Sequence, residues 1–192
     1  MTDEEDIYFL EDQTITLDDF PCDKGWILDF GGGGEGVIGQ IKESQVIAID
    51  RRESELLEAI ENGSKALPII MDGKELKFLD NTFHTATSFY TLMYVPEENL
   101  LSILKEFYRV LTLKGKFIIW GVNFTHPTEF DKNLIAFRLK IKLPSGKLIE
   151  TGYGTRKKSQ SMKQIINFAK EAGFTIITSK EEGILFQITL QK

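Results

Sequence analysis

A glycine-rich turn near the amino end of the chain constrains the fold more than any other feature. The apolar run WILDF (26–30) contains an acidic residue and leads into GGGGEG (31–36), after which VIGQIKES can open a helix. Five glycines in six residues let the backbone bend sharply and approach a neighbour where a side chain would clash. This order of strand, tight turn and helix is typical of a nucleotide-binding α/β domain, whose ligand lies at the amino end of the first helix.

The same order of elements repeats along the chain. Apolar runs at four places predict further strands: VIAID (46–50), LPIIMD (67–72), TATSFYT (85–91) and KFIIWG (116–121). Amphipathic helices are predicted at 52–62 and 97–112, with Gly63 and Gly115 ending them. Alternation of apolar strands and helices predicts a parallel sheet with right-handed crossovers. We therefore expect an α/β fold with a Rossmann-like, doubly wound, mostly parallel seven-stranded sheet.

Two later segments break this rhythm. Residues 134–153 alternate apolar and basic side chains around a PSG turn, which predicts a β-hairpin with one apolar and one basic face. This hairpin lies in an insertion or cap spanning 123–158. Ser161 and Gln164 then have the spacing of a helix N-cap, and residues 174–190 are expected to close the sheet as an antiparallel pair.

Composition bounds the class of protein. With 192 residues, 42% of them apolar, we expect a single domain over 1–192 with its own core. Cys22 is the one cysteine, so an intramolecular disulfide and a Cys-based zinc site are excluded, and we expect no metal and an inert thiol. No apolar run approaches about 18 residues, so no membrane span is predicted. The acidic start MTDEED favours a cytoplasmic protein.

Charge is distributed unevenly. The net charge of −6 argues against a general nucleic-acid binder. Residues 1–25 form an acidic segment, whereas 132–158 hold eight bases against Glu150 alone. The basic hairpin face suits a solvated surface, an acidic substrate, a nucleic-acid segment or the acidic amino terminus of the chain itself. An exposed edge strand of the hairpin could equally form a homodimer.

Acidic residues near the ends of three strands indicate the ligand. Asp29 and Glu35 flank the glycine turn, and no Lys or Arg occurs between 25 and 41, so a pyrophosphate would be repelled. This argues against a nicotinamide-dependent oxidoreductase. Asp50 is placed to accept hydrogen bonds from ribose hydroxyls, and Asp72 with Gly73 from an adenine amino group. Adenine, ribose and a cationic amino-acid tail without phosphates describe S-adenosylmethionine.

Five segments together carry a family resemblance. WILDFGGGGEG, VIAIDR, MDGKELKFLDNTFHTATSF, EFYRVLTLKGKFIIWG and EAGF occur in an order that resembles class I S-adenosylmethionine-dependent methyltransferases, over residues 26–122 and 160–190. The resemblance implies that strand-end residues hold the cofactor: its methionine end at Asp29, Gly31, Gly32 and Gly33, its ribose at Asp50, and its adenine at Arg51, Asp72 and Gly73, with Ser88 completing the pocket.

Three positions depart from the family's pattern. Glu35 stands where a third glycine is usual, with Gly36 one step later, so the turn can be one residue longer. His84 stands where an acid is usual, and LKG replaces the common Pro-Gly-Gly before the strand at 116–121. None of these departures removes a side chain that the resemblance assigns to the cofactor.

Methyl transfer from a sulfonium requires alignment and exclusion of water more than a strong catalytic side chain. The sequence therefore assigns no catalytic residue, and His126, Tyr153 and Asp131 are candidates for a base by position only. His84, inside a strand, is expected to be structural. We expect a methyltransferase acting on a small-molecule acceptor, with 1–25 and 123–158 closing over the cofactor from either side. The alternative is a non-catalytic protein that binds S-adenosylmethionine on the same scaffold.

Overall fold

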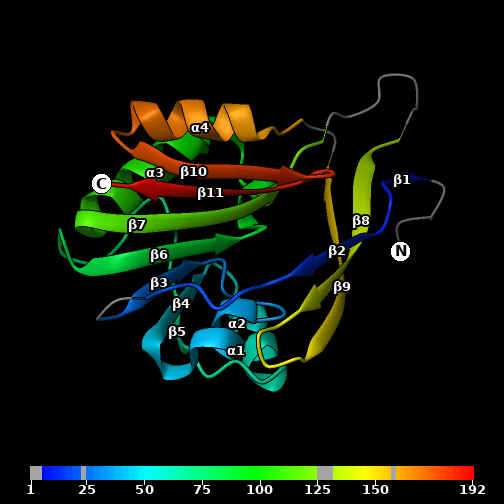
Figure 1. The fold of residues 1–192 in the computed structure, drawn as a ribbon, viewed down its shortest axis with the longest axis horizontal. Helices are drawn as coiled ribbons and strands as arrows, with labels where there is room; N and C mark the ends of the chain where they lie inside the picture. The colour runs from blue at the N-terminus through cyan, green and yellow to red at the C-terminus, as the bar shows by residue number, and fades with distance from the viewer. Residues whose placement is uncertain (1–5, 23–24, 125–131, 157–158) are drawn as a thin grey trace.

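The computed structural model describes residues 6–22, 25–124, 132–156 and 159–192. Its main feature is a seven-stranded sheet in the order β10–β11–β7–β6–β3–β4–β5 (Figure 1). The strands of this sheet are β3 (Ile27–Phe30), β4 (Val46–Asp50), β5 (Leu67–Ile70), β6 (Phe83–Phe89), β7 (Leu111–Val122), β10 (Thr175–Glu182) and β11 (Leu185–Gln191). The five strands from β3 to β7 are parallel, and β11 and β10 join them antiparallel. The predicted doubly wound sheet with an antiparallel closing pair is confirmed.

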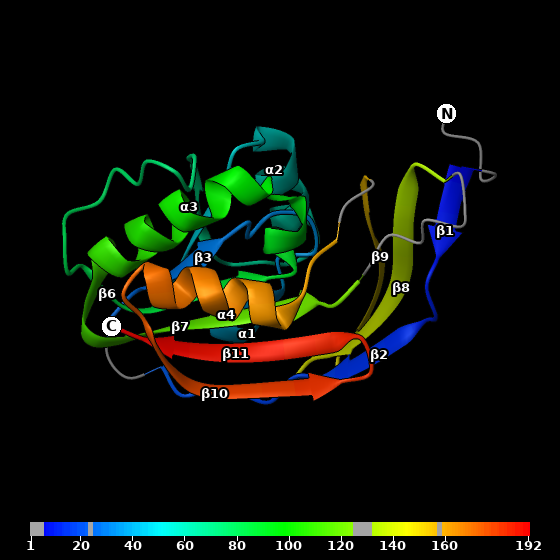
Figure 2. The same cartoon turned by 90° about the horizontal axis from the view of Figure 1, so that it is seen from above.

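Helices cover both faces of this sheet. They are α1 (Val37–Lys42), α2 (Glu53–Glu61), α3 (Glu97–Val110) and α4 (Met162–Glu171), with short 3-10 helices η2 (Glu43–Gln45) and η3 (Thr91–Tyr94). Figure 2 shows α3 and α4 together on one face of the sheet. Within the described ranges, no helix combines the length and apolar character that spanning a membrane requires.

Alternating side chains along the strands build a separate core on each face. Ile27 and Ile118 contribute to one core, together with α1, while their neighbours Leu28 and Ile119 contribute to the other, beneath α3. Because successive side chains of a strand point to opposite faces, a strand buried on both faces is apolar at consecutive positions. This explains why the parallel strands have continuous apolar runs in the sequence.

A smaller sheet stands beside the carboxyl ends of the parallel strands (Figures 1 and 2). The hairpin strands β8 (Leu134–Lys142) and β9 (Leu148–Arg156) pair antiparallel, as predicted. On the other side of β8, the strands β1 (Ile7–Phe9) and β2 (Gln13–Thr16) pair parallel with it. Phe137, Leu139 and Ile141 of β8 are buried in the first core, and the basic side chains between them are exposed.

The structure corrects two expectations about the segments around the sheet. The amino-terminal segment and the hairpin do not approach from either side: β1 and β2 join the hairpin in one sheet. Helix α3 ends at Val110, before the expected stop at Gly115. Leu111 already pairs with Phe83 in β6, and the pairing resumes at Lys116 with Thr85, so residues 112–115 form a bulge inside β7.

Candidate functional site

A pocket of about 680 Å³ opens at the carboxyl ends of the parallel strands. The glycine turn 31–36 lines it, together with Asp29 of β3, Asp50 of β4 and Asp72 after β5. On the side of the small sheet it is lined by Tyr153 of β9. Ligands of open α/β sheets bind outside the carboxyl ends of the strands, where the crossovers change direction. The geometry therefore brings the predicted strand-end acids together at one ligand-sized concavity.

Asp29 is the buried acid of the pocket. It is 2% exposed, and Thr87 Oγ1 of the neighbouring β6 donates a hydrogen bond of 2.7 Å to its Oδ1. Burial raises the pKa of Asp29 to about 7, the hydrogen bond from Thr87 lowers it, and the carboxylate of Asp50 raises it further. A cation or a hydrogen-bond donor bound beside Asp29 would favour its ionised form.

The glycines of the turn are required by close approach to the rest of the protein. A Cβ at Gly31, where φ is +70°, would lie 2.3 Å from the side chain of Thr91. A Cβ at Gly32 would lie 2.6 Å from Asp29 Oδ2, and one at Gly33 2.4 Å from the Cβ of Glu55. The turn thus threads between β3, β4, α2 and η3, and its backbone is left exposed to the pocket.

Asp50 and Asp72 each hold the chain that follows them. Asp50 Oδ1 accepts from the backbone N–H of Arg52 at 2.9 Å, and Asp72 Oδ1 accepts from that of Lys74 at 2.9 Å. Arg51 Nε lies 3.9 Å from Asp72 Oδ2, so this side chain reaches from the end of β4 to the end of β5. All of these residues line the pocket.

Gly73 and Ser88 are placed differently from the other predicted site residues. Neither lines the pocket. A Cβ at Gly73 would lie 2.6 Å from the ring of Phe30, so this glycine serves packing. Ser88 is 0% exposed, and its Oγ has no hydrogen-bond partner in the described structure. At the end of β6, Phe89 lines the pocket instead, followed by Thr91 of η3.

The charge of the pocket is predominantly negative. Its described acids are Asp29, Glu35, Asp50, Glu55, Glu58 and Asp72, and its described bases are Arg51, Arg52 and Lys74. Arg52 is already paired with Glu55 at 3.2 Å. Burial raises the pKa of Glu55, and the positive charge of Arg52 lowers it. An excess of carboxylates in a partly desolvated pocket favours a ligand that carries positive charge and disfavours a polyphosphate.

Several side chains of the pocket were not assigned to the cofactor from sequence, among them Glu35 and Tyr94. The carboxylate of Glu35 accepts hydrogen bonds from Thr151 Oγ1 and, at 3.2 Å, from the hydroxyl of Tyr153. Tyr94 of η3 also lines the pocket. Only the departure of Glu35 from the glycine pattern could have drawn attention to it, since its partners are more than 110 positions away.

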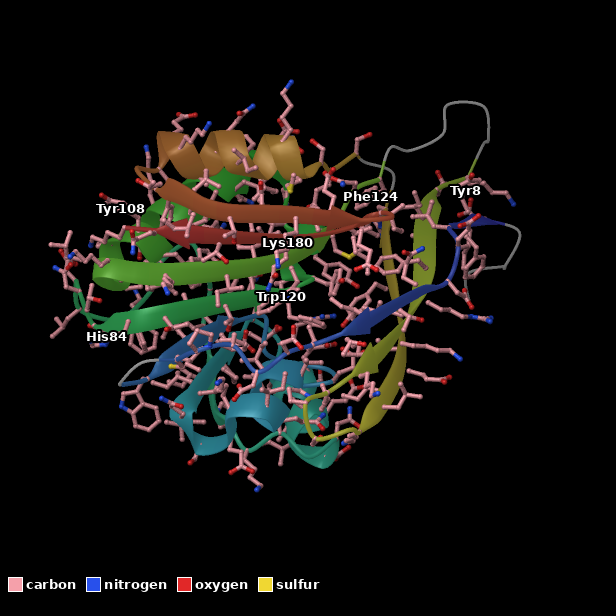
Figure 3. All side chains as sticks on the ribbon, in the orientation of Figure 1. Tyr8, His84, Tyr108, Trp120, Phe124 and Lys180 are labelled. Carbon is pink, nitrogen blue, oxygen red and sulfur yellow. The ribbon has the colours of Figure 1, made fainter. Side chains whose placement is uncertain are left out.

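The candidate bases have different outcomes. Tyr153 lies in the pocket wall, whereas His126 and Asp131 lie outside the described residues. His84 is exposed at the amino end of β6, away from the small sheet (Figure 3).

Cys22 Sγ lies 3.8 Å from Thr85 Oγ1 and accepts from Gln45 Nε2 at 3.4 Å, outside the pocket.

Comparisons with known proteins agree with this geometry. Residues 28–119 match the family described as methyltransferase domain. A stretch of 65 residues, 34% of this chain, is 37% identical to a sterol 4-C-methyltransferase of Caenorhabditis elegans. That match spans 18% of the length of the curated relative.

Solved structures with the same fold cover most of the chain. The S-adenosylmethionine-dependent methyltransferase of Mesorhizobium loti, 14% identical, aligns over 87% of this chain and 90% of its own with a TM-score of 0.62. One from Methanosarcina mazei, 20% identical, aligns over 92% and 94% with a TM-score of 0.62. The match to the methyltransferase-domain family covers nearly half of the chain, and these solved methyltransferases share its fold.

Proposed function

We propose that this chain transfers the methyl group of S-adenosylmethionine to a small, partly apolar molecule bound between the cofactor and β9. The observation that carries this proposal is the composition of the site: strand-end acids and a glycine turn line the same pocket as a set of aromatic and aliphatic side chains. The apolar lining includes Phe89, Tyr94, Val95, Ile103 and Tyr153. A concave site of this composition suits a small molecule.

The strand-end acids and the glycine turn fit the cofactor. We propose that Asp29 and the backbone at Gly31, Gly32 and Gly33 hold its methionine end, where the amino group carries positive charge. Asp50 would accept from the ribose hydroxyls, and the adenine would lie between Arg51 and Asp72. Since Gly73 and Ser88 do not line the pocket, we propose that they support its walls through Phe30 and β6.

The basic face of the hairpin bears on the choice of acceptor. Arg138, Lys140 and Lys142 are exposed, on the opposite face of β8 from the buried Phe137 and Leu139. Lys140 is paired with Glu150 across the hairpin at 3.2 Å. These bases are directed away from the first core, so they do not select an acidic acceptor inside the pocket. A nucleic acid would contact the outer face of the hairpin, separate from the site of transfer.

The protein's own contribution to the reaction is alignment and exclusion of water. When bound, the cofactor supplies an electrophilic methyl group, so the acceptor needs to be held in line with it. The Tyr153 hydroxyl donates to Glu35, and burial, followed by the charge of Glu35, raises the pKa of Tyr153 well above its ordinary value. Tyr153 therefore stays protonated at neutral pH. In this arrangement it donates a hydrogen bond to Glu35 and forms part of the pocket lining.

The proposal is tested by turnover. Purified protein is incubated with S-adenosylmethionine and separate sets of acceptors: small alcohols, phenols and amines, sterols, unmodified peptides and RNA. Formation of S-adenosylhomocysteine and of the methylated product is measured by mass spectrometry. We expect turnover with a small molecule. Transfer to peptide or RNA alone would contradict the proposed acceptor class, and tight cofactor binding without any turnover would support the non-catalytic alternative. The cytoplasmic location and the homodimer stay predictions of the sequence.

A further inference from the structure

Glu35 joins the glycine turn to the hairpin. Its side chain accepts hydrogen bonds from Thr151 and Tyr153, two alternate residues on the inner face of β9. The ring of Tyr153 packs against Tyr90, with centroids 5.2 Å apart, and against Phe137, at 5.7 Å. Glu35 thus contacts a part of β9 that is fixed to the aromatic core, so the contact links two rigid elements.

A second connection runs through the tip of the hairpin. Lys147 Nζ donates to Gln40 Oε1 at 2.7 Å and to the backbone oxygen of Asn62 at 3.0 Å. The side chains of the same two residues hold the glycine turn: Gln40 Nε2 donates to the carbonyl of Glu35 at 2.7 Å, and Asn62 Nδ2 to that of Gly34 at 3.1 Å. The middle of β9 and the tip of the hairpin before it are therefore both connected to the glycine turn.

These contacts are unusual in that all of them converge on residues 34–35. Glu35 departs from the glycine pattern of the turn, and the hairpin departs from the repeated order of strand and helix. The two departures meet in space through direct hydrogen bonds. Hydrogen bonds to a charged group are stronger than neutral ones, so the bonds that Glu35 accepts give it a larger effect on β9 than a neutral side chain would have.

We propose that Glu35 is a positioning residue that fastens β9 to the cofactor turn, so that cofactor binding and the ordering of β9 beside the acceptor are coupled. This inference rests on the proposed function, since it takes the turn as the cofactor site. A ligand held by the backbone of 31–33 restrains the turn, and the restraint passes to β9 through residues 34 and 35. Coupling of two binding events is reciprocal, so a variant that loosens the hairpin is expected to bind the cofactor less tightly.

Hydrogen–deuterium exchange of the full chain tests the coupling without a known acceptor. Exchange of the backbone amides of 148–156 is measured with and without S-adenosylhomocysteine, with 162–171 of α4 as an internal reference. In the wild type we expect the ligand to slow exchange in β9. In Glu35→Ala we expect exchange in β9 to be about tenfold faster without ligand, and the slowing by ligand to be lost.

A second variant distinguishes the effect of fastening β9 to the glycine turn from any direct contact between Glu35 and the ligand. Thr151→Val with Lys147→Met removes donors of the hairpin, and neither residue lines the pocket. We expect this double variant to show the same hydrogen–deuterium exchange as Glu35→Ala. Its affinity for S-adenosylhomocysteine, measured by calorimetry, should fall about tenfold. Glu150→Gln, on the outer face of β9, is the matched control and should behave like wild type.

The outcomes distinguish the inference from the proposed function. If S-adenosylhomocysteine fails to bind folded wild-type protein, the proposed cofactor site is wrong. The exchange of β9 without ligand still tests whether Glu35 fastens β9 to the glycine turn. Equal exchange of β9 in wild type and in both variants would overturn the inference. So would a double variant that binds the ligand as tightly as wild type and retains the slowing of β9.

Discussion

Thr87 Oγ1 donates a hydrogen bond of 2.7 Å to Asp29 Oδ1 between two adjacent parallel strands. The carboxyl group is buried, and its pKa is raised to about 7 because burial outweighs this hydrogen bond. A group whose pKa is higher in the folded state binds a proton more tightly there than in the unfolded chain. Its contribution to stability is therefore present at low pH and is lost as pH rises through the folded pKa.

Asp29→Asn should remove this dependence on pH. Between about pH 5.5 and 8, the free energy of unfolding of the wild type should fall by about 2 kcal/mol relative to that of the variant. Asn is uncharged and similar in size, and it can still accept from Thr87. Urea unfolding of both proteins across this range is the measurement. Parallel curves for the two proteins would show that Asp29 does not titrate in this range, which would contradict a pKa of about 7.

Asp50→Asn should lower the affinity for S-adenosylhomocysteine by about tenfold, because one acceptor for the ribose hydroxyls becomes an amide donor. The remaining oxygen can still accept from the backbone of Arg52, so the fold should be retained. Asp80→Asn is the control, since Asp80 pairs with Arg109 on the surface and does not line the pocket. Calorimetric titration gives both affinities. An unchanged affinity in Asp50→Asn would remove Asp50 from the cofactor site.

Gly33→Ala should destabilise the fold by about 2 kcal/mol, because its Cβ would overlap Glu55, including a backbone carbon at 3.0 Å. Gly146→Ala at the hairpin tip should cost about 1 kcal/mol, since a Cβ there meets nothing within 4 Å and only the positive φ is unfavourable. The free energies of unfolding in urea compare the two variants. A larger loss at Gly146 would contradict the close packing of the turn.

Phe137→Ala should destabilise the protein by about 3–5 kcal/mol. Phe137 is 2% exposed and contacts the rings of Tyr90 and Tyr153 between the hairpin and the main sheet. Since the hairpin belongs to the core, we expect one cooperative unfolding transition that is shifted as a whole. If a fluorescence-detected transition of the hairpin separated from that of the main sheet, or if the loss were below about 1 kcal/mol, the hairpin would be an independent appendage.

Much of this site could be predicted from the sequence, because its signals are local. A glycine turn directly follows an apolar strand, and Asp50 ends the next one, so neighbours in the chain become neighbours at the carboxyl edge of the sheet. The placement of Ser88 was less predictable. Alternation fixes which face of β6 a side chain points to, but the surrounding chain decides whether that face is open to the pocket.

The contacts of the small sheet had no local signal. The side chains of Asp6 and Asn133 are hydrogen bonded across 127 positions, and β1 has only three residues. An alternating pattern identifies a strand and its buried face, but it does not identify the partner. For the same reason the departure at Glu35 was visible in the sequence, whereas its partners in β9 were not.

The cofactor is the central claim, and calorimetric titration of the purified chain with S-adenosylmethionine, S-adenosylhomocysteine and NADH tests it most directly. We predict saturable binding of both sulfur compounds, with no binding of NADH, because the acidic turn disfavours a pyrophosphate. Circular dichroism of the same sample establishes that the protein is folded. A folded protein that binds NADH, or neither sulfur compound, would contradict the account.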